Sequence, residues 1–138
     1  MLKLSTHPDA QGDIEGLWAT APKAAARILA LIEQLKADPR LLDVLTIHNF
    51  GADRTEAIAV SKVVSQWSGT GRRDGRDLWR LKLWDLERQQ LPYRVIYAYE
   101  IRRLRYHVLG VINRKDYNYE PEHPFTKRVL RAYDDVCG

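Results

Sequence analysis

The chain has 138 residues, 45% hydrophobic and 29% charged, a balance that excludes a wholly disordered protein and favours a single folded domain. No apolar run approaches the ~20 residues of a membrane-spanning helix, and residues 1–16 lack the features of a signal peptide, so we expect a cytoplasmic protein without membrane contact. Cys137 is the single cysteine and the histidines show no metal-binding spacing, so we expect no disulfide, no metal and no cofactor.

The positive charge is concentrated in one part of the chain. Net charge is +4 and the isoelectric point is near 9.3, and the cations gather between Arg72 and Arg114, where nearly all are arginine. The planar guanidinium group suits phosphate. This stretch therefore favours a polyanionic partner, with a solvated arginine surface as the alternative for any one residue.

The first forty residues predict one strand and two helices. Alternating leucines predict a short strand over residues 1–5, and the spacing of Ile14, Leu17 and Trp18 predicts a short helix over 9–18. A longer amphipathic helix follows, with Thr20 as its expected N-cap and its end before Pro39.

Residues 41–77 carry a weaker pattern. Apolar residues over 57–67 fit neither the helical nor the strand period cleanly, so a short helix and an irregular strand are both open, and we favour the helix. The following "SGTGRRDG" (68–75) predicts a mobile basic loop.

Three strands are predicted next, over residues 77–86, 93–100 and 104–112. Their short connections indicate an antiparallel meander. Pro124 then begins a predicted C-terminal helix. The expected fold class is α+β, with a short N-terminal strand and two helices packed on an antiparallel sheet of three to four strands, and a helix at the C-terminus.

Alternation places two cations on one face of the strand over 77–86. Trp79, Leu81 and Leu83 share the expected core face, and the opposite face carries Arg80, Lys82 and Trp84. Residues two apart on a strand lie about 7 Å from one another, roughly the spacing of adjacent phosphates. An uncovered face of this kind is a candidate binding surface.

Further cations and phenols lie on the neighbouring strands. Arg94 is a charge inside an otherwise apolar strand, so it needs a ligand phosphate or a carboxylate such as Asp85 or Glu100. Directly behind the apolar run "YHVLGVI" comes "NRKDYNYEPEHPF" (113–125), which carries Arg114, Lys115, Tyr117 and Tyr119, and whose prolines and His123 we expect to turn the chain into the last helix. We expect the cations to form one constellation at an end of the sheet.

The second half of the chain has three strand segments in the order "LWRLKL", "YRVIY" and "YHVLGVINRKDYNY", preceded by two helices and followed by a terminal helix. This order of elements and motifs resembles the RelE/ParE superfamily of bacterial type II toxins, and most closely its RelE branch. The resemblance covers about the last 60 residues well and implies a single RelE-like domain over 1–138 with an insertion at about 46–76. It implies the toxin of a type II toxin-antitoxin system, a ribosome-dependent mRNA endoribonuclease. The implied partners are a cognate antitoxin, the ribosome and mRNA.

The resemblance also implies roles for single residues. Arg80 and Lys82 match positions that bind and activate the scissile phosphate, Arg94 and Arg114 match two other basic positions, and Tyr117 or Tyr119 matches a tyrosine that stacks on mRNA or assists proton transfer. The implied reaction is metal-independent attack of an RNA 2′-hydroxyl on the adjacent phosphate. It needs a base, for which a lysine among arginines with a lowered pKa is the candidate, and cations at the developing charge.

Three alternatives stay open at this point. The fold also serves ParE-like inhibitors of a protein target such as DNA gyrase, and a non-catalytic RNA-binding protein fits the same cations. The third is a ribonuclease that uses His107 and His123 as its acid and base. His107 lies inside a predicted strand and His123 precedes a proline, positions at which histidine is more often structural.

Overall fold

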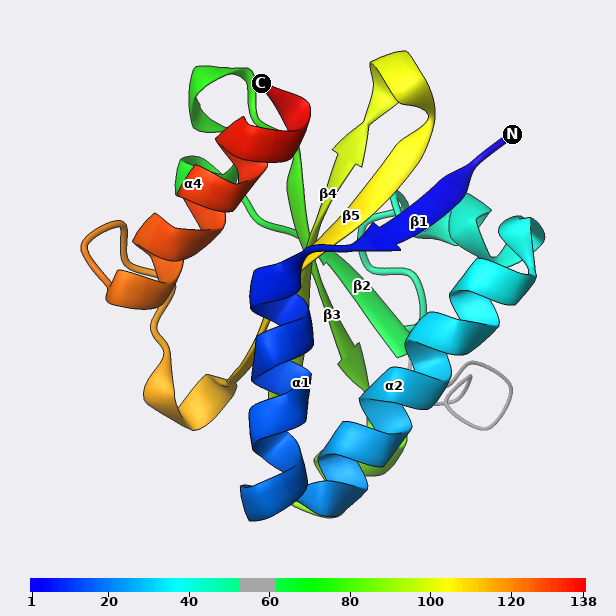
Figure 1. The fold of residues 1–138 in the computed structure, drawn as a ribbon, viewed down its shortest axis with the longest axis vertical. Helices are drawn as coiled ribbons and strands as arrows, with labels where there is room; N and C mark the ends of the chain where they lie inside the picture. Colours follow the sequence, from blue (N-terminus) through cyan, green and yellow to red (C-terminus); the bar gives the residue numbers. More distant parts are fainter. Residues whose placement is uncertain (53–61) are drawn as a thin grey trace.

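The structure, a computed structural model, describes residues 1–52 and 62–138 and has an α+β fold (Figure 1). Five strands form one mixed sheet in the order β1-β5-β4-β3-β2. None of the helices in the described ranges has the length and apolarity that crossing a bilayer requires. The strands are β1 (Lys3–Thr6), β2 (Lys62–Gln66), β3 (Leu78–Leu83), β4 (Tyr93–Glu100) and β5 (Arg105–Asn113), and the helices are α1 (Pro8–Thr20), α2 (Pro22–Ala37), α3 (Trp84–Arg88) and α4 (Pro124–Cys137).

The first strand and both N-terminal helices form as predicted, with one exception at a helix start. β1 pairs in parallel with β5, at the opposite edge of the sheet from β2. The prediction that Thr20 caps α2 is wrong, because Thr20 is the last residue of α1, and Ala21 occupies the N-cap without a side-chain hydrogen bond. Pro22 lies in the first turn and has no backbone N–H, so this end of the helix has one donor fewer for a cap to satisfy.

The predicted antiparallel meander of β3, β4 and β5 is confirmed. The predicted strand bounds agree to within one residue except at the end of the first strand, because β3 stops at Leu83 and Trp84 begins α3. Continued extension would place Leu86 on the same face as Arg80 and Lys82. The helical turn instead buries Leu86 in the core, where its side chain is 2% exposed.

The segment before β3 forms an edge strand. The helix expected over 57–67 is wrong for Lys62–Gln66, which is β2 and pairs antiparallel with β3, whereas residues 57–61 lie outside the described residues. The strand form buries Val64 completely in the main core. Beyond β2, residues 69–75 form short turns in which Gly71 packs against Trp67, and a Cβ there would lie 2.6 Å from the indole.

The sheet separates two apolar cores. α1 and α2 cover one face, and α4 covers the other (Figure 1). β5 has an irregularity opposite Ile96 and Tyr97, and a Cβ at Gly110 would lie 2.7 Å from the Phe125 ring, so this glycine lets α4 approach the sheet closely. α4 therefore packs tightly on β5.

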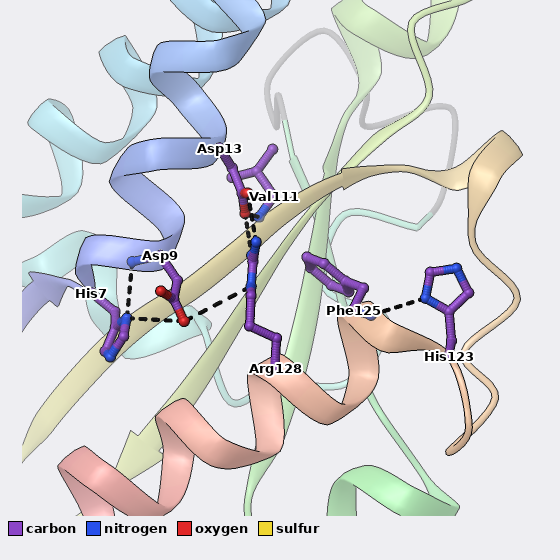
Figure 2. Close-up of polar contacts among 7 residues, drawn as sticks. All are labelled: His7, Asp9, Asp13, Val111, His123, Phe125 and Arg128. Carbon is purple, nitrogen blue, oxygen red and sulfur yellow. Dashed lines mark hydrogen bonds and ion pairs between the residues drawn. The ribbon is translucent and has the colours of Figure 1, made fainter.

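A polar clamp ties α1 to α4 across β5 (Figure 2). β1 ends before it can pair with the second half of β5, and the Asp13 carboxylate accepts the Val111 N–H instead, at 2.9 Å. Arg128 of α4 donates to the same carboxylate, with Nη1 2.9 Å from Oδ1, and this hydrogen bond raises the pKa of Arg128. His123 caps α4 by accepting the Phe125 N–H, which confirms its expected structural role.

Candidate anion-binding site

A pocket of about 190 Å³ opens on the face of the sheet that carries Arg80 and Lys82. Its described walls come from β2, β3, β4 and the segment that follows β5. They are Val63, Ser65, Arg80, Leu81, Lys82, Arg94, Arg114 and Tyr119. Five of the six residues implied as site residues by the sequence resemblance thus line one pocket, and Tyr117 does not.

The strand register explains how distant cations come together. Arg80 and Lys82 project from β3 on the pocket side, whereas Trp79, Leu81 and Leu83 belong to the core on the other side, as alternation predicts. Arg94 of β4 pairs with Ile112 of β5, two residues before Arg114, so β4 and the segment that follows β5 each place one arginine at the same end of the sheet.

Tyr119 is a platform for two of the arginines. The guanidinium carbon of Arg80 lies 4.7 Å from the ring centroid, and that of Arg114 lies 5.2 Å from it. The ring packs edge-on against buried Trp67, with centroids 5.4 Å apart. Tyr119 holds this position with φ of 63°, a left-handed backbone that is costly for a bulky residue and that clusters at functional sites.

The Tyr119 hydroxyl is buried and has no hydrogen-bond partner in the described part of the chain. An atom that solvent does not reach is poorly placed to transfer a proton to a substrate in the pocket. Of the two roles that the sequence resemblance implies for this tyrosine, stacking fits the geometry better.

Arg94 has a carboxylate partner, but neither of the two considered from the sequence. Its Nη1 donates to Glu87 of α3, and the arginine side chain is only 15% exposed. Asp85 instead contacts Arg27 at 2.7 Å, and Glu100 contacts His107 at 3.0 Å. The acid that pairs with Arg94 therefore comes from the short helix after β3. The sequence prediction extended β3 through this segment and so did not bring Glu87 close to Arg94.

The three other pocket cations each lie over an aromatic ring. Among residues 1–52 and 62–138, Arg80 and Arg114 have no carboxylate partner, and Arg114 donates to the Tyr117 carbonyl oxygen at 2.6 Å. Lys82 Nζ lies 4.9 Å from the Trp84 ring centroid, and the Trp84 indole N–H donates to the Gly51 carbonyl oxygen at 2.9 Å. Arg80 and Arg114 therefore present preorganised positive charge to the pocket.

Tyr117 and the two candidate histidines lie outside this pocket. Tyr117 is 2% exposed and its hydroxyl contacts the Thr126 hydroxyl at 2.5 Å, and burial raises the pKa of Tyr117 to about 12. His123 starts α4, and His107 lies near Cys137 at its other end, so the two are separated by about 20 Å, the length of a 14-residue helix. This distance argues against a paired acid and base.

Three pocket features were missed from the sequence. Val63 and Ser65 line it because β2 is a strand, and Glu87 pairs with Arg94 because the chain turns into α3. The sequence did carry one signal for this strand, the β-branched residues in "SKVVSQ".

No protein-family model, curated protein or solved structure matches this chain.

Proposed function

We propose that the chain is the toxin component of a type II toxin-antitoxin system and acts as an mRNA endoribonuclease on the ribosome. The observation that carries this proposal is the convergence of Arg80, Lys82, Arg94 and Arg114 on one small pocket. Arginine forks match phosphate oxygens geometrically, and RNA supplies phosphates along an extended strand. The sequence resemblance to the RelE branch supplies the reaction class.

The pocket supports a reaction at one phosphate. The RNA 2′-hydroxyl attacks phosphorus and gives up its proton, and the bond to the 5′-oxygen breaks. The 5′-oxygen takes up a proton from water, and the products are a 2′,3′-cyclic phosphate and a 5′-hydroxyl. Arg80 and Arg114, fixed by the Tyr119 ring, face the negative charge that grows on the phosphate oxygens. Lys82 is the lining residue best suited to accept the 2′-hydroxyl proton, because arginine does not deprotonate in proteins.

The partners and the location are part of the same proposal. Cytoplasmic mRNA in the ribosomal A site is the substrate, and an antitoxin encoded beside the toxin gene is the inhibitor. Both follow from the sequence resemblance and not from a contact in the structure. Co-expression with a small adjacent reading frame is expected to relieve growth arrest by the toxin alone.

Cleavage on translating ribosomes tests the proposal. Purified protein is added to a translation reaction, and the mRNA ends are mapped. We expect cuts with 5′-hydroxyl ends that disappear in Arg80→Ala and Arg114→Ala but persist in Arg131→Ala, which removes an exposed arginine of α4 outside the pocket. Equal cleavage by all variants would overturn the assignment of the site.

Two other outcomes would replace the proposed function. Intact mRNA together with inhibited DNA supercoiling would indicate a ParE-like inhibitor of a protein target. Intact mRNA together with RNA affinity that falls steeply with salt would indicate a non-catalytic RNA-binding protein.

A further inference from the structure

Three metal-ligand side chains meet at the end of the sheet that lies away from the pocket. They are Glu100 at the end of β4, His107 on β5 and Cys137 in the last turn of α4. Their ligand atoms all lie within 4.8 Å of one another, and His107 Nε2 is 3.0 Å from Glu100 Oε1. The side chains of Glu100 and His107 are each 9% exposed, so the cluster is sheltered from solvent.

The separations are close to those of a tetrahedral zinc site. Zinc bonds of about 2.0–2.1 Å to nitrogen and oxygen place those two ligands about 3.3 Å apart, near the 3.0 Å found between His107 and Glu100. A zinc–sulfur bond of about 2.3 Å requires sulfur about 3.5 Å from the other ligands, so from separations of at most 4.8 Å Cys137 must move inward by about 1.3 Å or less. Its position in a terminal helical turn makes such a shift inexpensive.

The charges around the cluster tolerate a cation. The C-terminal end of α4, which carries Cys137, has the partial negative charge of a helix terminus. Arg103 approaches Glu100 at 3.6 Å, but its side chain is 72% exposed and can turn into solvent. Arg72, Arg76 and Arg102 border the nearby cavity. Arg72 and Arg76 each lie 3.2 Å from an aspartate that offsets the charge, and Arg102 is exposed to solvent.

A cavity of about 550 Å³ borders two of the three ligands, Glu100 and Cys137. It offers a path of entry for an ion and space for a water molecule as a fourth ligand. Three protein ligands with one open position are the pattern of an accessible zinc site and differ from the closed sites that have four protein ligands. Sequence spacing gave no sign of this site, because the ligands come from three separate elements.

We propose that Glu100, His107 and Cys137 form a binding site for Zn²⁺, with one exchangeable position facing the cavity. The ion would connect β4, β5 and α4 at the end where the helix and both strands meet. Glu100 and Arg94 lie at opposite ends of β4, about 20 Å apart along the strand, so this site is independent of the proposed RNA pocket. Burial raises the pKa of the Cys137 thiol to about 12, which leaves it neutral and unreactive without a metal.

Titration of the full chain, free of any affinity tag, with Co²⁺ tests the proposal. We expect one ion per chain, with visible d–d bands of four-coordinate cobalt and a thiolate-to-cobalt charge-transfer band in the near ultraviolet, both bleached by Zn²⁺. Absence of the charge-transfer band in the wild-type protein would overturn the proposed site.

Variants separate the three-ligand site from binding to a thiol alone. Cys137→Ser is expected to abolish the charge-transfer band, and His107→Gln to weaken Co²⁺ affinity by at least about tenfold. His48→Gln and Glu122→Gln remove a histidine and an acid elsewhere and are expected to keep wild-type affinity. Circular dichroism identifies variants that remain folded. Unchanged affinity in folded His107→Gln would overturn the proposal.

Discussion

Two pairs of arginines at opposite ends of the sheet have different partners. At the pocket end, Arg80 and Arg114 stack on one tyrosine ring and have no carboxylate partner within the described ranges. At the other end, Arg72 and Arg76 each lie 3.2 Å from an aspartate. The sequence presents all four as one basic stretch. The structure separates cations that are available to an anionic ligand from cations that are already neutralised.

The ligand chemistry of the two ends is opposite as well. The pocket end gathers Arg80, Lys82, Arg94 and Arg114, which suit phosphate. The far end gathers a carboxylate, an imidazole and a thiol, which suit a metal cation. One sheet therefore carries a candidate anion site and a candidate cation site, and experiments can test each end against the other.

The largest expected effect comes from removing an arginine at the pocket end. Arg80→Ala is expected to lower the rate of RNA cleavage by at least about 100-fold, because a preorganised charge at the phosphate is lost. Arg72→Ala, at the other end, is expected to leave the rate within about twofold of wild type. Initial rates on the same RNA measure both. Equal losses of cleavage rate in the two variants would contradict the functional difference between the two ends of the sheet.

The burial of Tyr117 predicts a loss of stability at alkaline pH. Burial raises the pKa of Tyr117 from 10.0 to about 12, so the unfolded chain ionises before the folded one as pH rises. Its contribution, complete below pH 10 and lost by about pH 12, is about 3 kcal/mol. Urea unfolding from pH 9 to 12 is expected to show a smaller decline in Tyr117→Phe than in wild type. Identical declines would contradict the core placement.

Two variants of Tyr119 separate the ring from its hydroxyl. Tyr119→Ala is expected to reduce cleavage about tenfold, because two cation–π contacts of about 0.5–1 kcal/mol each are lost. Tyr119→Phe keeps the ring and is expected to stay near the wild-type rate. If the phenylalanine variant were as impaired as the alanine variant, the hydroxyl would have a chemical role that its burial argues against.

The smallest expected effect is on the salt dependence of RNA binding. Each phosphate contact with single-stranded RNA contributes about 0.7 to the slope of log affinity against log salt concentration. Arg114→Ala is expected to reduce the slope by about 0.7, whereas Arg73→Ala, an exposed arginine outside the pocket, is expected to leave it unchanged. Fluorescence anisotropy over a salt series measures the slope. A reduction in the second variant alone would reverse the comparison.

Much of this arrangement is predictable from local patterns. Alternation places Arg80 and Lys82 on the pocket face of β3, and the short connections predict the meander that brings Arg94 and Arg114 to the same end. These features depend on residues close in sequence. Pro124 at the start of α4 is predictable for the same reason.

The features that were missed depend on tertiary contacts. β2 gains its strand form by pairing with β3, and β3 ends early because Leu86 packs into the core. Arg94 meets Glu87 only because the chain turns there. The cluster around His107 unites three elements whose spacing along the chain carries no motif.

Binding of single-stranded RNA to two double variants tests the central claim most directly. Arg80→Ala with Arg114→Ala removes two pocket cations, and Arg72→Ala with Arg73→Ala removes two exposed cations near the far end. The account predicts that the first variant loses most RNA affinity at moderate salt and that the second keeps nearly all of it. Equal affinity in the two variants, or a greater loss in the second, would contradict it.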